Sequence, residues 1–133
     1  MQKAVAAMKK LELSFDLIVS SPFVRARQTA EIVAAGLKLK KRLEFSDGLT
    51  PDGDFEALIR ELNALKPAPK ELLLVGHEPH LSRFIALLCS GNLNATIEMK
   101  KGGLCKLESE RLVPGHCARL DWLLTPSQLE LMG

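Results

Sequence analysis

The sequence has no long hydrophobic run. Its longest apolar stretches are five or six residues, such as 84–89, whereas a helix that spans a bilayer needs about 20 apolar residues. No apolar segment follows the lysines near the N-terminus, as one would in a secretory signal peptide. We therefore expect a soluble, cytoplasmic protein that does not engage a membrane.

The sequence also has few cysteines and only a small excess of positive over negative charge. The three cysteines, Cys89, Cys105 and Cys117, form no Cys-x-x-Cys pair, which argues against a disulfide framework or a structural zinc site. The 18 basic and 16 acidic residues are mixed along the chain and leave a net charge of +2. Since there is no long basic tract, we expect no nucleic-acid partner.

The sequence contains enough apolar residues to form one hydrophobic core. With 133 residues, 47% of them hydrophobic, the chain fits a single domain over residues 1–133. Apolar runs typical of buried strands alternate with segments of helical periodicity. Strands are expected at 15–21, 41–45 and 71–76, helices at 1–10, 22–36, 54–65 and 79–89, and two or three more strands within 95–124, around a Gly-Gly bend and a Pro-Gly turn.

Residue types at the segment ends support this division. Pro22 is suited to a helix start, Gly36 to a helix C-cap and Asp54 to a helix N-cap. Alternating strands and helices predict an α/β fold, a three-layer sandwich in which a mostly parallel sheet has helices on both faces.

Two strand-to-helix turns, "SSPFVR" and "GHEP", have the residues best suited to chemistry. Parallel sheets bind ligands at the carboxyl ends of their strands, where helix N-termini favour anions. Arg25 could grip a phosphate with its planar guanidinium, and Ser20 and Ser21 offer hydroxyls beside it. His77 could supply a proton or a positive charge.

Structural roles remain open for all of these residues. Ser20 and Ser21 could only cap a helix, and His77 could be a hydrogen-bonded turn residue. Arg27 is expected to be a solvated helix charge, His80 a hydrogen-bonded residue at a helix start, and His116 an exposed turn residue. The aspartates at 47, 52 and 54 are better explained by turns and caps than by a site.

Other catalytic motifs are missing or unsuitable. The chain contains neither Gly-x-Ser-x-Gly nor the phosphate-binding Gly-x-x-x-x-Gly-Lys-[Ser/Thr] loop. Cys105 and Arg111 have the spacing of a thiol phosphatase loop, but the intervening "KLESE" has no glycine and two glutamates that would repel phosphate. We treat that spacing as a coincidence.

Longer motifs resemble a known family. "SSPFVRARQTAEIV" (20–33) followed by "LLLVGHEPHLS" (72–82) resembles the histidine phosphatase superfamily, which has the phosphoglycerate mutase-like fold. "LTPDGD" (49–54) and "MKKGG" (99–103) are similar to its SixA-type phosphohistidine phosphatases. The resemblance covers essentially the whole chain.

The resemblance implies a phosphatase that transfers a phosphoryl group to a histidine nucleophile and then to water. It assigns phosphate binding to Arg25 and makes His77 the second histidine of the pocket, with Ser20 and Glu78 as further substrate-binding residues. The implied substrate is a phosphorylated histidine of a protein or, alternatively, a small phosphate ester. No cofactor or metal is expected.

One family motif is missing from the sequence. The family's nucleophile lies in an Arg-His-Gly motif at the end of its first strand, and this chain contains no Arg-His-Gly. We expect the sequence to be an N-terminally shortened form of such an enzyme, inactive by itself. Alternatives are a natural phosphate-binding or regulatory module, completed by strand exchange in a homodimer, and a phosphatase that uses other groups.

Overall fold

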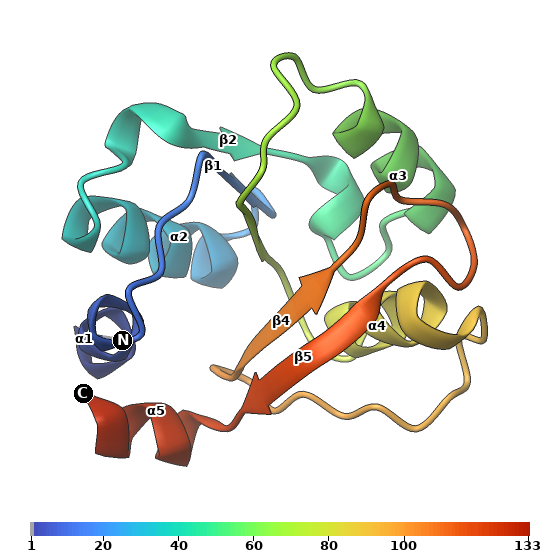
Figure 1. Cartoon of the computed structure of the whole chain (residues 1–133). Helices are drawn as coiled ribbons and strands as arrows, with labels where there is room; N and C mark the ends of the chain where they lie inside the picture. The colour runs from blue at the N-terminus through green and yellow to red at the C-terminus, as the bar shows by residue number, and fades with distance from the viewer. Residues whose placement is uncertain (1) are drawn as a thin grey trace.

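The structure, a computed structural model, describes residues 2–133. Figure 1 shows the elements, which in chain order are α1 (Gln2–Lys10), β1 (Leu17–Ser20), α2 (Val24–Gly36), the 3₁₀ helix η1 (Lys40–Arg42), β2 (Leu43–Phe45), the 3₁₀ helix η2 (Asp47–Leu49), α3 (Phe55–Asn63), β3 (Leu72–Val75), α4 (His80–Ser90), β4 (Leu104–Glu108), β5 (Arg119–Leu124) and α5 (Pro126–Met132). The expected first helix corresponds to α1, and Met1 lies outside the described residues.

The first three strands form a parallel sheet in the order β2-β1-β3. In its register Ser20 lies opposite Phe45 on one side and Val75 on the other, so all three strands end at the same edge. β4 and β5 form a separate antiparallel pair with an irregularity between Lys106 and Leu107. The predicted α/β fold with a parallel sheet and helices is confirmed.

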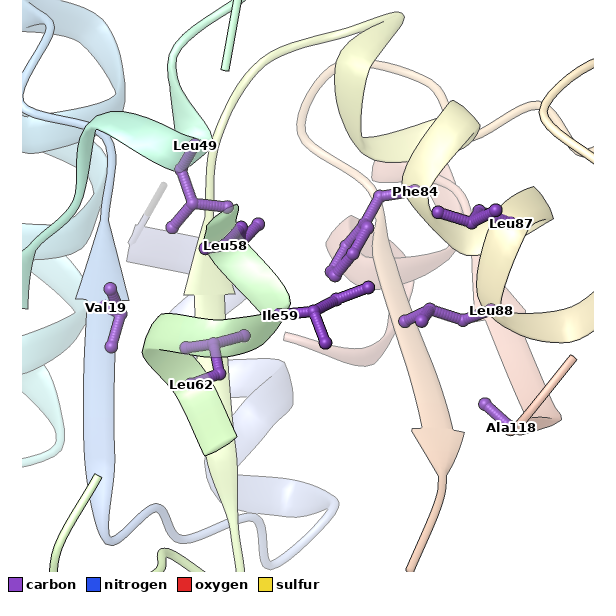
Figure 2. Close-up of a cluster of buried hydrophobic side chains, with 9 residues drawn as sticks. All are labelled: Val19, Leu49, Leu58, Ile59, Leu62, Phe84, Leu87, Leu88 and Ala118. Atoms are coloured by element: carbon purple, nitrogen blue, oxygen red, sulfur yellow. The ribbon is translucent and has the colours of Figure 1, made fainter. Parts of the chain in front are cut away.

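Successive residues of β1 point to opposite faces of the sheet and lie in two different apolar clusters. Val19 belongs to a cluster with side chains of α3 and α4, and Ile18 to a cluster with side chains of α1 and α2. In Figure 2 Ile59 of α3 points toward Phe84 and Leu88 of α4. Fully burying a side chain of this size contributes about 1.5 to 3 kcal/mol, so the two clusters hold the helices on the strands.

Gly36 has a role different from the expected C-cap. It is the last residue of α2, and Leu37 is the C-cap residue. A Cβ atom at Gly36 would lie 2.5 Å from Cγ1 of Val5. The glycine is therefore needed because α1 and α2 pack closely at this point.

The start of the second helix, the place of the Gly-Gly bend and the C-terminal segment differ from the expectation. Pro22 precedes the N-cap residue Phe23, so α2 begins later than predicted. The Gly-Gly bend lies before β4, where Gly103 N–H donates to the Lys100 carbonyl at 2.8 Å, rather than between two strands. α5 was not predicted; its capping box, Thr125 with Gln128, was the signal that could have revealed it, and it packs beside α1 (Figure 1).

Candidate functional site

The two motif turns lie next to each other because β1 and β3 are paired. The Ser21 N–H donates to the Val75 carbonyl at 2.9 Å, which continues the strand pairing into the first turn. His77 follows β3 by two residues, and α2 begins at Val24. The two turns, and with them the candidate site, therefore lie at the carboxyl edge of the parallel sheet, as the strand and helix pattern predicts.

The SSPFVR turn, which follows β1, holds the side chain of His77 in place. Its Nε2 atom lies 2.8 Å from Oγ of Ser21, and its ring meets the Phe23 ring edge-on with 5.7 Å between centroids. Oγ of the fully buried Ser21 also accepts a hydrogen bond from Phe23 N–H at 3.2 Å. These contacts fix the plane of the imidazole at the start of α2.

The surroundings of His77 favour its neutral form. Burial, and to a smaller extent the electrostatic interaction with His80, lower the pKa of His77 below the ordinary histidine value. A neutral imidazole has one donor and one acceptor nitrogen. With Nε2 beside Ser21, the other nitrogen, Nδ1, can donate to a ligand if the Ser21 hydroxyl is the donor to Nε2.

Arg25 is the second residue of α2, two positions beyond the Phe23 ring that touches His77. It is exposed and makes no ion pair within residues 2–133. Arg27 is exposed but lies 3.9 Å from Glu31, one turn on. The prediction of Arg27 as a solvated helix charge is thus confirmed, and Arg25 keeps its guanidinium available for an anion.

Ser20 and Ser21 differ in what their hydroxyls do. Ser20 is fully buried and its hydroxyl donates to the Ser21 carbonyl at 2.9 Å. The contact with His77 belongs to Ser21, which the sequence offered only as a neighbouring hydroxyl. The assignment of Ser20 to substrate binding stays a prediction.

The side chain of Glu78 lies in a different environment from that of His77. Its Oε1 accepts a hydrogen bond from the Ser82 hydroxyl, and its Oε2 is buried with no hydrogen-bond partner in the part of the chain that the structure describes. Burial raises the pKa of Glu78, while the Ser82 hydrogen bonds act in the opposite direction. Glu78 lines a hollow between α4 and the segment 93–101.

His80, Asp54 and His116 have the structural roles that the sequence predicts for them. His80 is buried, donates from Nε2 to the Gly48 carbonyl at 2.8 Å, and stacks on Phe55 with 4.5 Å between ring centroids. Asp54 accepts a hydrogen bond from Glu56 N–H at 3.0 Å and caps α3, and His116 is exposed. The structural roles expected for these three residues are confirmed.

Cys105 is unsuited to nucleophilic chemistry. It lies within β4, and burial raises the pKa of its thiol to about 11. The reactive form of cysteine is the thiolate, so the Cys105–Arg111 spacing has no catalytic meaning.

Across residues 2–133 no three His, Cys, Asp or Glu side chains gather in a way that could hold a metal ion. None of the helices between Gln2 and Met132 is long and apolar enough to cross a membrane.

Comparison with known proteins gives consistent matches. Residues 1–67 match the family described as the histidine phosphatase superfamily (branch 1). An uncharacterized protein of Picosynechococcus sp. is 37% identical over 103 residues, which is 77% of this chain and 62% of that protein. The phosphohistidine phosphatase SixA homolog of Haemophilus influenzae is 37% identical over 78 residues, 56% of this chain and 48% of that protein.

SixA itself is also similar in sequence and in structure. Phosphohistidine phosphatase SixA of Escherichia coli is 33% identical over 85 residues, 63% of this chain and 53% of that protein. A structure of the protein histidine phosphatase SixA complexed with tungstate has a TM-score of 0.76 at 25% identity, over 96% of this chain and 80% of that one. A putative phosphohistidine phosphatase SixA from Agrobacterium tumefaciens has the same fold, with a TM-score of 0.67 at 21% identity, over 93% and 77% of the two chains.

The chain spans about half to three fifths of the length of the curated relatives that it matches. Its family match begins at the first residue and includes the first motif turn. On these matches, the chain belongs to the histidine phosphatase superfamily, branch 1, and is SixA-like.

Proposed function

We propose that this chain binds the phosphoryl group of a phosphohistidine as the substrate-holding part of a SixA-like phosphatase. Arg25 and His77 are the phosphate ligands in this proposal. The observation that carries it is the contact of His77 with Ser21 and Phe23, which holds the imidazole at the N-terminus of the helix that bears Arg25.

The chemistry needs what these residues offer. Phosphoryl transfer depends on positioning and on stabilising charge at the transferring oxygens. Arg25 supplies a permanent charge and two parallel donors, and His77 a single oriented donor. Phe23, the N-cap residue of α2, makes no side-chain capping bond, so amides of the first turn add to the positive end of the helix.

A protein phosphohistidine is the substrate that we favour over a small phosphate ester. The nitrogen leaving group of a phosphoramidate needs less help from a general acid than an alkoxide does. His77, whose lowered pKa favours its neutral form, is suited to donating a hydrogen bond rather than a full proton. The SixA names of the relatives agree with this substrate class.

We propose that the chain alone binds phosphoryl groups without hydrolysing them. By its resemblance to the family, hydrolysis needs the histidine of an Arg-His-Gly motif, which this sequence does not contain. The same observation favours the second candidate, a non-catalytic phosphate-binding or regulatory module.

We propose that a strand carrying the Arg-His-Gly motif would pair with the edge of β3. Among the described strands β3 pairs with β1 alone and β4 with β5 alone. Leu104 of β4 packs against the cluster that contains Leu73 of β3, and Leu107 packs against the other cluster, which Leu72 and Leu74 of β3 also contact. An added strand beside β3 would end next to the His77 turn. A second copy of this chain could pair there, but it would not bring an Arg-His-Gly motif.

Calorimetric titration with tungstate, a phosphate mimic, tests the proposal. Arg25→Ala should weaken binding by about 1 to 3 kcal/mol, the contribution of charge-assisted hydrogen bonds, and His77→Ala should weaken it too. Arg27→Ala is the matched control, because Arg27 is exposed on the same helix and pairs with Glu31. Wild-type affinity in both Arg25→Ala and His77→Ala would overturn the proposal.

Hydrolysis is tested separately with a phosphoramidate. We expect no turnover above buffer for the chain alone. Turnover that survives His77→Ala would show that the roles assigned here are wrong.

A further inference from the structure

A hollow of about 710 Å³ lies next to the His77 turn, between the first turns of α4 and the segment 93–101. Its apolar lining includes Pro79, Ile97 and Met99, and its cationic lining consists of Arg83, Lys100 and Lys101. The volume is within the range of ligand sites, about 300 to 1,000 Å³. We call it the α4 groove.

The α4 groove is tied to the candidate phosphate ligand by one hydrogen-bonded chain. Ser82 on α4 donates from its hydroxyl to Glu78 Oε1 and accepts from Met99 N–H at 2.9 Å. Glu78 directly follows His77, and Lys100 directly follows Met99. The segment with the two lysines is therefore fastened to the turn that presents His77.

A tight turn fixes the lysines further. Gly103 N–H donates to the Lys100 carbonyl at 2.8 Å, and Gly102 between them has a φ of +83°. Glycine adopts this left-handed conformation without strain. The backbone of the lysine pair is thus set by hydrogen bonds at both ends.

Cationic side chains outnumber acidic ones in the lining of the α4 groove by three to two. Arg83, Lys100 and Lys101 are exposed, and none of them forms an ion pair with a residue in 2–133. The acidic lining residues are Glu78 and Glu98. Of these two, Glu78 is already engaged within the chain, because its Oε1 accepts the hydrogen bond from the Ser82 hydroxyl.

We propose that the α4 groove receives the polypeptide that flanks the phosphohistidine of a protein substrate, with acidic side chains of that polypeptide meeting Arg83, Lys100 and Lys101. The inference rests on the proposed function, because the phosphoryl group is placed at Arg25 and His77. A small phosphate ester would leave the groove unused. An apolar floor with a basic rim is complementary to a peptide with apolar and acidic residues.

The test compares two peptides that carry a non-hydrolysable phosphohistidine analogue, phosphoryltriazolylalanine. One has glutamates in its flanks and the other has glutamines at the same positions. Fluorescence anisotropy should give tighter binding of the acidic peptide, by about threefold to tenfold, the range expected for one or two exposed ion pairs. Raising the salt concentration about tenfold should remove most of this preference.

Charge-neutralised variants locate the preference. Lys100→Gln with Lys101→Gln should remove most of it, because Arg83 alone remains, and should leave binding of the glutamine peptide unchanged. Lys40→Gln with Lys41→Gln is the matched control, since this exposed pair in η1 precedes β2 at the opposite edge of the sheet. The control should keep the full preference.

The outcomes separate the two proposals. If the Lys100 and Lys101 variant keeps the acidic preference while Arg25→Ala weakens binding of both peptides, the groove inference is wrong and the proposed function stands. If Arg25→Ala and His77→Ala bind both peptides like the wild type, the proposed function fails, and this inference fails with it. Equal wild-type affinity for the two peptides also overturns the groove inference.

Discussion

Ser21 Oγ and His77 Nε2 lie 2.8 Å apart although 56 positions separate the two residues in the chain. The register of β1 with β3, which places Ser20 opposite Val75, brings them together. A neutral imidazole beside a buried hydroxyl has a defined orientation, which is what a phosphoryl-binding histidine needs. The contact on which the candidate site is built thus depends on the pairing of the two strands and is not formed by either motif alone.

Ser21→Ala should therefore weaken tungstate binding through His77. Loss of the hydrogen bond leaves the imidazole less well oriented, and we expect an affinity loss of about 1 kcal/mol, or roughly fivefold. Titration calorimetry measures it, with Ser127→Ala, an exposed serine in α5, as the control. In a His77→Ala background the Ser21 substitution should have little further effect. An equal loss in both backgrounds would mean that Ser21 acts through the fold and not through His77.

The stability of the protein should respond to the protonation of His77. Its folded pKa is lowered, so between that value and the unfolded value of about 6.5 the unfolded chain binds more protons. Stability is therefore complete above the unfolded pKa and falls as the pH drops through this window. Urea unfolding at several pH values should show a smaller loss for His77→Gln than for the wild type. Parallel pH profiles for the two proteins would contradict the burial of His77.

Glu78 should have the opposite effect. Its folded pKa is raised by burial, so the folded state binds more protons than the unfolded state above the ordinary glutamate value of about 4.3. The ionised carboxyl then opposes folding as the pH rises through the folded pKa. Glu78→Gln should be more stable than the wild type at pH 8 and lose that advantage near pH 4, as measured by urea unfolding. Glu110→Gln, at an exposed position, should show no comparable gain.

Much of the fold follows from local pattern, but the site does not follow completely. Asp54 caps α3 as predicted, because a capping residue acts on the amides that follow it directly. The choice between Ser20 and Ser21 is different in kind. Two adjacent serines have the same chemistry, and only the register of β1 with β3 decides which one reaches His77.

Gly36 and the lysine segment show the same limit. Gly36 has the sequence features of a C-cap, yet it is required by the approach of Val5 from another helix. Nothing in the sequence near the lysines at 100 and 101 indicates that the Ser82 hydroxyl accepts a hydrogen bond from Met99 N–H and so holds this segment to α4. Both facts depend on residues distant in the sequence, which periodicity cannot report.

A substitution at Gly53 tests whether the close approach of Gly53 to Gly48 supports the start of α4. A Cβ atom at Gly53 would lie 2.2 Å from the Gly48 carbonyl oxygen, a backbone atom that cannot move without shifting the turn. The same carbonyl accepts the hydrogen bond from His80 Nε2 at 2.8 Å, at the first residue of α4. Gly53→Ala should therefore reduce the free energy of unfolding by about 1 to 3 kcal/mol, as overpacking does.

Gly115→Ala is the matched control for this substitution. Apart from its chain neighbours, no atom in residues 2–133 lies within 4 Å of a Cβ placed at Gly115. Its effect should stay within about 0.5 kcal/mol, as for exposed positions without special contacts. Urea unfolding of the two variants measures the difference directly. Equal midpoints would show that the turn relaxes without strain, and His80 would then not depend on the close approach of Gly53 to Gly48.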